Sequence, residues 1–180
     1  MKSARLNKGF TLIEILIVIA VIVLLVTLGQ KYIPQLFGQT GTLQEGQLLN
    51  TGIAQIRSLK QSKADFTGFT TAEVANSGVF PDQYVRNKGT NTATVVNQWG
   101  GNISFAPANV NGTNDGFTVT DTSIPENVCK GIPSSVSENA HSITIGTTSV
   151  KAAGGTVNDA AVGTACAGAT NTVIITVTKQ

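Results

Sequence analysis

The feature that most constrains this chain is an apolar run of 19 residues, residues 10–28, in which Glu14 is the only charged residue. As an α-helix the run would be about 28 Å long, close to the thickness of the hydrocarbon core of a bilayer. Lys2, Arg5 and Lys8 precede it. The positive-inside rule therefore predicts a cytoplasmic N-terminus, a single membrane-spanning helix and an exported C-terminal part.

Three ordinary explanations compete for this run. A cleavable secretory signal could end at the small-residue triplet Thr27-Leu28-Gly29. Its apolar core, however, is normally about 7–15 residues long, and a carboxylate inside it would be unusual. A buried helix of a soluble domain does not carry so long an uninterrupted stretch of Ile, Val and Leu. A plain single-pass anchor explains both the length and the basic flank, and it is the strongest of the three.

Glu14 separates a plain anchor from a more specific interpretation. A carboxylate at the centre of an apolar span costs about 2.5–3.5 kcal/mol on insertion scales, and less near an end, where it can reach the headgroups. Residues 8–14 read KGFTLIE, following a basic leader and opening the apolar helix. This segment resembles the prepilin cleavage motif of type IV pilins and their relatives.

The resemblance implies roles for three residues. Prepilin peptidase would cut between Gly9 and Phe10 on the cytoplasmic side and methylate the new amino group of Phe10. Gly9 has no side chain to obstruct an enzyme that needs close access to the backbone. Glu14 would meet the N-terminal ammonium of a neighbouring subunit, because pairing removes much of the desolvation cost of both charges. This pair would fix the register between subunits.

The chain is expected to have four parts. Residues 1–9 are the cleaved leader, residues 10–28 the transmembrane and filament-core helix, and residues 42–180 the globular pilin head. Residues 29–41 contain residues that weaken a helix, namely Gly29, Pro34, Gly38 and Gly41. We interpret them as a hinge, and a plain juxtamembrane linker is an equal alternative.

The head is predicted to be α+β, with the second, amphipathic half of a long N-terminal helix packed on an antiparallel sheet. The helical stripe consists of Leu49, Ile53, Ile56 and Leu59. Strands are predicted at residues 102–106, 116–120, 142–145 and 173–178, the first two pairing with each other. Residues 173–178 are nearly all β-branched, which favours the middle of the sheet. Short helices are predicted near residues 71–76, 124–132 and 159–167, and exposed loops over 146–172.

The head also resembles those of class-b type IV pilins. The segments that carry this resemblance are FTGF at 66–69, GVFP at 78–81, NQWGG at 97–101 and GFTV at 116–119, followed by Ile124, Pro125 and Cys129. The nine-residue leader and Phe10 are instead typical of class a.

Cys129 and Cys166 are the only cysteines. In a cytosolic chain they would be two unlinked thiols, whereas in an exported domain an even number favours one disulfide. Because the basic leader and apolar run predict export of the C-terminal part, we expect a Cys129–Cys166 disulfide bounding the C-terminal region.

Charge and residue content exclude several functions. The leader carries three of the 12 Lys and Arg residues, so nine remain against 10 acids and the net charge falls from +2 to −1. Bulk charge thus indicates no nucleic-acid partner. His141 is the only histidine, Asp115 and Asp121 flank a strand, and Asp159 stands alone. We therefore expect that the protein is not an enzyme, that it has no cofactor, and that it has no site for calcium or another metal.

These observations predict a structural type IV pilin. Its partners would be other pilin subunits, prepilin peptidase and the inner-membrane assembly machinery. The precursor would span the inner membrane once, with a cytoplasmic N-terminus, and the mature subunit would join an extracellular filament. The alternatives are a type II secretion pseudopilin, a minor tip-located adhesive pilin, and a membrane-anchored binding or enzyme domain that uses the same leader.

Overall fold

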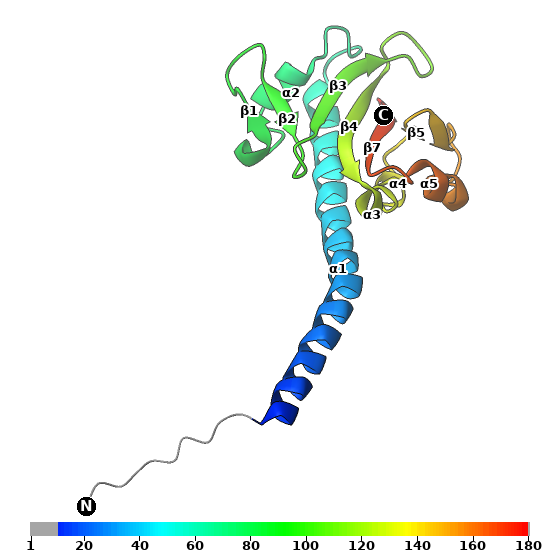
Figure 1. The fold of residues 1–180 in the computed structure, drawn as a ribbon. Helices are drawn as coiled ribbons and strands as arrows, with labels where there is room; N and C mark the ends of the chain where they lie inside the picture. The colour runs from blue at the N-terminus through cyan, green and yellow to red at the C-terminus, as the bar shows by residue number, and fades with distance from the viewer. Residues whose placement is uncertain (1–10, 180) are drawn as a thin grey trace, which may run out of the picture. The chain divides into compact units, whose positions relative to one another are not determined.

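The computed structural model describes residues 11–179, except for the side chains of residues 29–38. The predicted cleavage and methylation positions, Gly9 and Phe10, lie outside the described residues. The chain forms two compact units, one ending at Phe37 and the other beginning at Gly38. Helix α1 (Leu12–Lys60) contributes to both units (Figure 1). It is continuous through residues 29–41, and the hinge stays a prediction.

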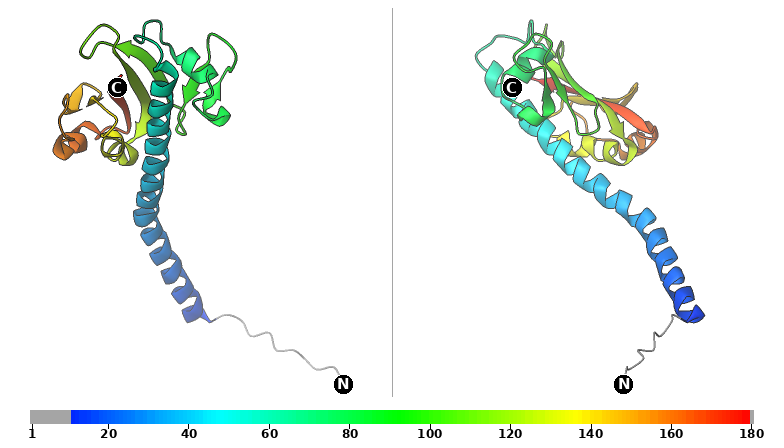
Figure 2. Two further views of the ribbon diagram at one scale, coloured as in Figure 1. Left: turned by 180° about the vertical axis from the view of Figure 1, so that it is seen from behind. Right: turned by 60° about the vertical axis from the view of Figure 1, so that its left-hand side comes forward.

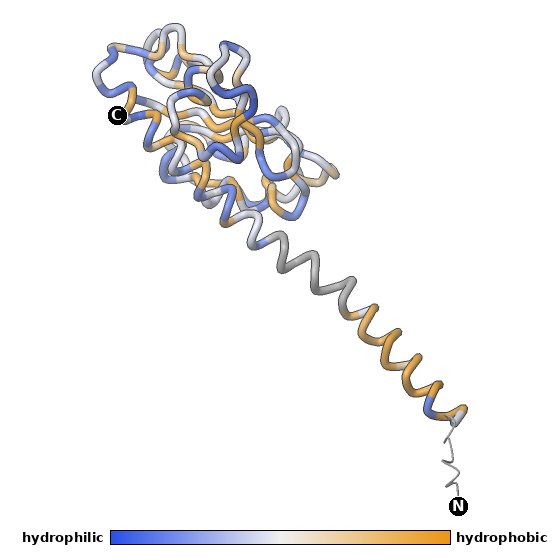
Figure 3. Tube along the Cα trace, turned by 90° about the vertical axis from the view of Figure 1, so that its left-hand side faces the viewer, coloured by the Kyte–Doolittle hydropathy of each residue, from blue (hydrophilic) through white to orange (hydrophobic). Residues whose placement is uncertain are grey.

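The first unit presents apolar side chains to its surroundings. Leu12, Ile13 and Leu16 are 79%, 66% and 56% exposed, and the apolar side chains that follow to Leu28 are also exposed. Figure 3 shows this stretch of α1 in orange. Within the described part of the chain, no helix has both the length and the hydropathy required of a membrane span. The membrane-spanning helix stays a prediction.

The second unit is built on one antiparallel sheet of seven strands in the order β1-β2-β3-β4-β7-β5-β6. The strands are β1 (Val85–Arg86), β2 (Thr94–Val96), β3 (Asn102–Ala108), β4 (Gly116–Pro125), β5 (Ser142–Ile145), β6 (Thr148–Lys151) and β7 (Thr170–Thr178). Figures 1 and 2 show the cyan part of α1 lying against this sheet. The predicted α+β fold is confirmed.

The four predicted strands are present, and three of them, β3, β4 and β7, extend further than expected. β7 lies between β4 and β5, which confirms its central position. β3 and β4 pair with each other, with Phe105 opposite Val119. β4 continues to Pro125, so the prediction that Asp121 flanks a strand is wrong. Strands β1 and β2 are not predicted, because two or three residues are too short to show an alternating pattern, and the four residues of β6 do not alternate as those of β5 do.

Short helices occur near the predicted positions. α2 (Thr71–Asn76) and α5 (Asp159–Ala165) agree with the prediction. The single helix predicted at 124–132 is wrong, because its first two residues extend β4. The chain then forms α3 (Glu126–Cys129) and, after Gly131, α4 (Ile132–Val136). A 3₁₀ turn, η1 (Asp82–Tyr84), precedes β1. The expectation of exposed loops over 146–172 is partly wrong, since this range contains β6 and α5.

The predicted stripe on α1 packs into the core, except at its end. Leu49, Ile53 and Ile56 are each 1% exposed, whereas Leu59 is 53% exposed. Lys60, four residues after Ile56, takes the next buried position, with a side chain only 12% exposed. Its aliphatic stem covers the core while its ammonium group reaches a carboxylate at the surface.

Close packing of α1 against the head requires glycine at position 52. A Cβ there would lie 2.6 Å from the buried ring of Phe80. We expect Gly52→Ala to lower the free energy of unfolding by about 1–2 kcal/mol, because overpacking outweighs the gain in helix propensity. Gly163→Ala, in α5, is the control, since a Cβ at that position meets no atom within 4 Å. It should stabilise the protein by about 0.5–1 kcal/mol. Equal effects in denaturant titrations would contradict this explanation.

Candidate functional site

Glu14 lies in the first turn of α1, where its backbone N–H donates to the Thr11 carbonyl at 3.1 Å. A carboxylate at this end of a helix interacts favourably with the helix dipole. The side chain is exposed, and none of the ion pairs among the described residues includes it. Glu14 is therefore accessible to a cationic group of another chain.

The predicted disulfide is confirmed. Cys129 is the last residue of α3 and Cys166 follows the end of α5, and both are fully buried. Their Cα atoms are 5.8 Å apart, within the usual range for a disulfide. Asn158 positions the second cysteine, because its side chain caps α5 by accepting a hydrogen bond from Ala161 N at 3.1 Å. The bridge closes the region that contains α4, β5, β6 and α5.

A buried acidic pair lies between α1 and the sheet. Glu45 of α1 is 1% exposed and Asp121 of β4 is 0% exposed. Asn97, in the turn between β2 and β3, donates from Nδ2 to Asp121 Oδ1 at 2.8 Å and to the Thr122 carbonyl at 2.7 Å. Its own Oδ1 accepts from Gly101 N at 2.8 Å. One amide side chain thus joins the 97–101 turn to β4.

The local backbone explains why this network forms. The pairing of β4 with β7 shifts register between Asp121 and Ile124, and Ser123 has a positive φ of 60°. This bulge places the Thr122 carbonyl beside the 97–101 turn. The approach is so close that Gly101 has no room for a Cβ beside that carbonyl.

Burial changes the acidity of both carboxyl groups. Desolvation, together with the smaller effects of the charge and hydrogen bonding of the neighbouring Asp121, raises the pKa of Glu45 to about 8. Desolvation also raises the pKa of Asp121, while hydrogen bonds from Asn97, Glu45 and the Thr122 backbone oppose the rise. Hydrogen-bond donors around Asp121 favour its charged form, whereas both burial and Asp121 favour the neutral form of Glu45, so Glu45 holds the proton more tightly.

The sequence pattern did not single out Glu45, although a signal was present. Glu45 stands four residues before Leu49, so it continues the stripe of Leu49, Ile53 and Ile56 towards the N-terminus. An acid at an apolar position of an amphipathic helix is costly unless it has a buried partner. That partner, Asp121, comes from a strand 76 residues later and could not be identified from α1 alone.

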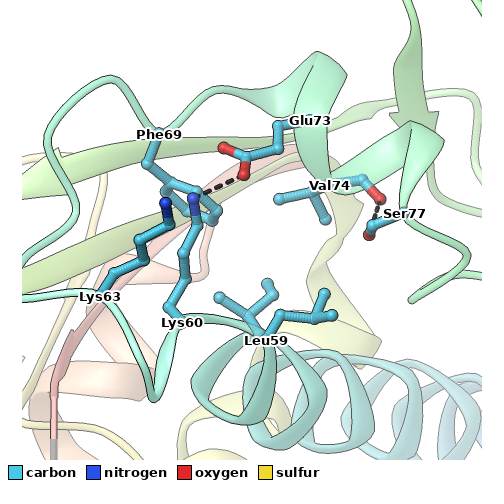
Figure 4. Close-up of a pocket in the computed structure, with 8 residues that line it drawn as sticks. Leu59, Lys60, Lys63, Phe69, Glu73, Val74 and Ser77 are labelled. Carbon is cyan, nitrogen blue, oxygen red and sulfur yellow. Dashed lines mark hydrogen bonds and ion pairs between the residues drawn. The ribbon is translucent and has the colours of Figure 1, made fainter.

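A small pocket of about 140 Å³ lies beside the last turns of α1 and is lined by Ile56, Leu59, Lys60, Lys63, Phe69, Glu73, Val74 and Ser77 (Figure 4). Lys60 Nζ is 2.5 Å from Glu73 Oε1 and 5.3 Å from the centre of the Phe69 ring. Ser77 Oγ donates to the Val74 carbonyl at 2.7 Å. The Ser77 hydroxyl is therefore engaged by the backbone of α2, and Glu73 is engaged by Lys60.

The remaining residues noted in the sequence lie apart. His141 precedes β5, and its backbone N–H donates to the Thr176 carbonyl at 2.8 Å. Asp115 accepts hydrogen bonds from Val110 N and Asn111 N, and the first of these chiefly lowers its pKa. Asp159 begins α5. In residues 11–179, no three His, Cys, Asp or Glu side chains gather as metal ligands would.

Comparisons with known proteins cover nearly the whole chain. A family described as PilS N terminal matches residues 40–178, and the prokaryotic N-terminal methylation motif matches residues 4–29. A type IV b pilin from Salmonella typhi is similar in structure, with a TM-score of 0.56 and 25% identity over 71% of this chain and 95% of that chain. TcpA, a type IV pilin from the Vibrio cholerae El Tor biotype, has a TM-score of 0.49 and 18% identity, over 76% of this chain and 98% of TcpA. No curated protein sequence matches the chain.

Proposed function

The chain belongs to the PilS N-terminal family and has the fold of type IV pilins, and from this premise we propose that it is a structural subunit of a type IV pilus. The observation that carries the proposal is the order of its parts. A methylation motif at residues 4–29 comes directly before a pilin head that the family matches over residues 40–178. Neither part alone would indicate a filament subunit as specifically.

The proposed path begins at the inner membrane. The precursor inserts through residues 10–28 with its basic leader in the cytoplasm, in accordance with the positive-inside rule. Prepilin peptidase then removes residues 1–9 and methylates the Phe10 amine. The assembly machinery of the inner membrane transfers the mature subunit into an extracellular filament.

Polymerisation would use the apolar surface of α1. The side chains from Leu12 to Leu28 are exposed in the isolated subunit, and Glu14 is the one carboxylate among them. Packing such helices side by side removes their apolar surface from water or lipid. Glu14 then needs a cation, and the Phe10 ammonium of the neighbouring subunit supplies it.

A type II secretion pseudopilin is the main alternative, since it would share the leader and the apolar helix. The solved structure with 25% identity is a type IV b pilin and agrees with the class-b resemblance of the head, which favours the pilin. Sheared surface filaments containing this chain would distinguish the two, because a pseudopilin builds a short periplasmic assembly.

Maturation provides the direct test. We expect mass spectrometry of filament protein to find Phe10 as the first residue, carrying one added methyl group. Gly9→Val should leave uncut precursor in the membrane, because a branched side chain obstructs access to the backbone at the cleavage site. Lys8→Ala, beside it, should still be cut. Filament protein beginning at Met1 or at Gln30 would refute the proposed processing.

A further inference from the structure

Among the residues that the structure describes, the buried acidic pair has no counter-charge. β2, β3, β7 and α4 contain no titratable side chain, and Asp121 is the only one in β4. In α3, Glu126 and Lys130 pair with each other at 2.6 Å at the surface. On α1, residues 38–56 contain no Lys, Arg or His, and the first such residue is Arg57, three turns beyond Glu45. Within the described part of the chain, no cation therefore faces the pair from the elements packed around it.

One oxygen of each carboxyl group lacks a hydrogen-bond donor, and a single proton placed between the two oxygens would supply it. Asp121 Oδ1 accepts from Asn97, but Glu45 Oε1 and Asp121 Oδ2, each almost fully buried, have no donor among the described residues. The two side chains are close enough to hydrogen-bond each other. A single proton between them would satisfy both atoms at once, whereas two buried carboxylates would leave both unsatisfied and repel each other.

The pair lies where α1 first packs on the head. At Gly41 a Cβ would lie 3.2 Å from the Trp99 ring and 3.2 Å from Val128 of α3. Thr42 Oγ1 donates to the Val128 carbonyl at 3.3 Å. Residues 41–45 therefore contact α3, the 97–101 turn and, through Glu45, strand β4.

We propose that Glu45 and Asp121 share one proton, and that this proton fastens residues 41–45 of α1 to β4 and the 97–101 turn. Its loss leaves two adjacent charges in a site without a cation, and the two separate when this segment moves away from the sheet. We call this pair of carboxyl groups and its shared proton the latch. It is a pH-sensitive contact at the start of the packed part of α1, and it does not depend on the biological role of the filament.

The sign of the pH dependence follows from proton uptake on closing. In the open or unfolded chain both acids ionise at about pH 4. In the closed head, Glu45 holds its proton up to about pH 8. The closed state is therefore fully favoured below about pH 4, loses about tenfold in its equilibrium constant per pH unit as the pH rises, and changes no further above about pH 8.

The test uses the full-length chain in detergent, with Trp99 as the reporter. Trp99 is the only tryptophan and contacts α1 at Gly41, so its fluorescence reports opening of residues 41–45. Glu45→Gln keeps the shape, cannot ionise, and can donate an N–H to Asp121. We expect the equilibrium constant of the wild type to fall about 1,000-fold between pH 5 and 8, and that of Glu45→Gln to fall far less.

The control is Glu126→Gln, which makes the same chemical change on an exposed acid of α3 and should keep the wild-type pH dependence. A second measurement does not depend on the variant. The infrared spectrum of the wild type at about pH 6 should contain a carboxylic-acid carbonyl band, since exposed Asp and Glu are ionised there, and Glu45→Gln should lack it.

Three results would overturn the latch. The first is an equal pH dependence of the wild type and Glu45→Gln, and the second is absence of the carboxylic-acid band from the wild type. The third is stabilisation of the wild type, but not of Glu45→Gln, by Ca²⁺ at about pH 8. That result would assign a cation, in place of the proton, to the space between the two carboxylates.

Discussion

Glu14→Ala is expected to abolish filament assembly while leaving the precursor inserted and cleaved. The substitution makes the apolar run more hydrophobic, so membrane insertion cannot suffer. In the filament it leaves the Phe10 ammonium of the neighbouring subunit without a partner. An unpaired charge in such an apolar surrounding costs about 3–5 kcal/mol, which weakens a subunit contact roughly 100-fold or more.

The measurement compares sheared filaments with the membrane pool in a strain that makes only the variant. Ile13→Ala is the matched control, because it also shortens an exposed side chain of the first turn of α1 but removes no charge. It should assemble nearly as well as the wild type. If Glu14→Ala forms normal numbers of filaments, Glu14 has no part in assembly.

Removing the disulfide is expected to lower the free energy of unfolding of the head by up to about 4 kcal/mol, the loop-closure value for a separation of 37 residues. A small domain has only about 5–15 kcal/mol in total, so subunits without the bridge should be degraded before assembly. The Cys129→Ala/Cys166→Ala double variant and the reduced wild type should unfold at similar denaturant concentrations.

As a control, the wild type and the double variant are each unfolded with and without reductant. The double variant should unfold at the same point with and without it, whereas the wild type should shift strongly. A thiol count on unreduced, purified subunit should find none. Two free thiols, or a double variant as stable as the oxidised wild type, would show that the bridge does not hold the head together.

Local patterns predicted the elements that are long or chemically distinctive. The nearly continuous run of β-branched residues at 173–178 placed β7 in the interior of the sheet, and the spacing of Leu49, Ile53 and Ile56 identified the buried face of α1. The edge strands β1 and β6 could not be predicted, because two residues carry no period and the four residues of β6 do not alternate. Their pairing depends on neighbouring strands that are already in place.

The sequence by itself determined the features that depend on neighbouring residues. These are the N-terminal methylation motif, the apolar segment that begins within it, and the α+β character of the head. The pairing of Cys129 with Cys166 also followed, because two cysteines in a domain that is predicted to be exported have only one possible partner each. Such features depend on composition, periodicity and count, which are all read along the chain.

Only the tertiary structure decided the chemistry of Glu45, Asp121 and Asn97. Separately they read as a helix acid, a strand-end acid and a turn amide, all ordinary at a protein surface. The fold buries both acids beside each other, 76 residues apart in sequence, and supplies one amide but, among the described side chains, no cation. A carboxyl group's proton affinity depends on solvent and charges within a few ångströms, and long-range packing sets both.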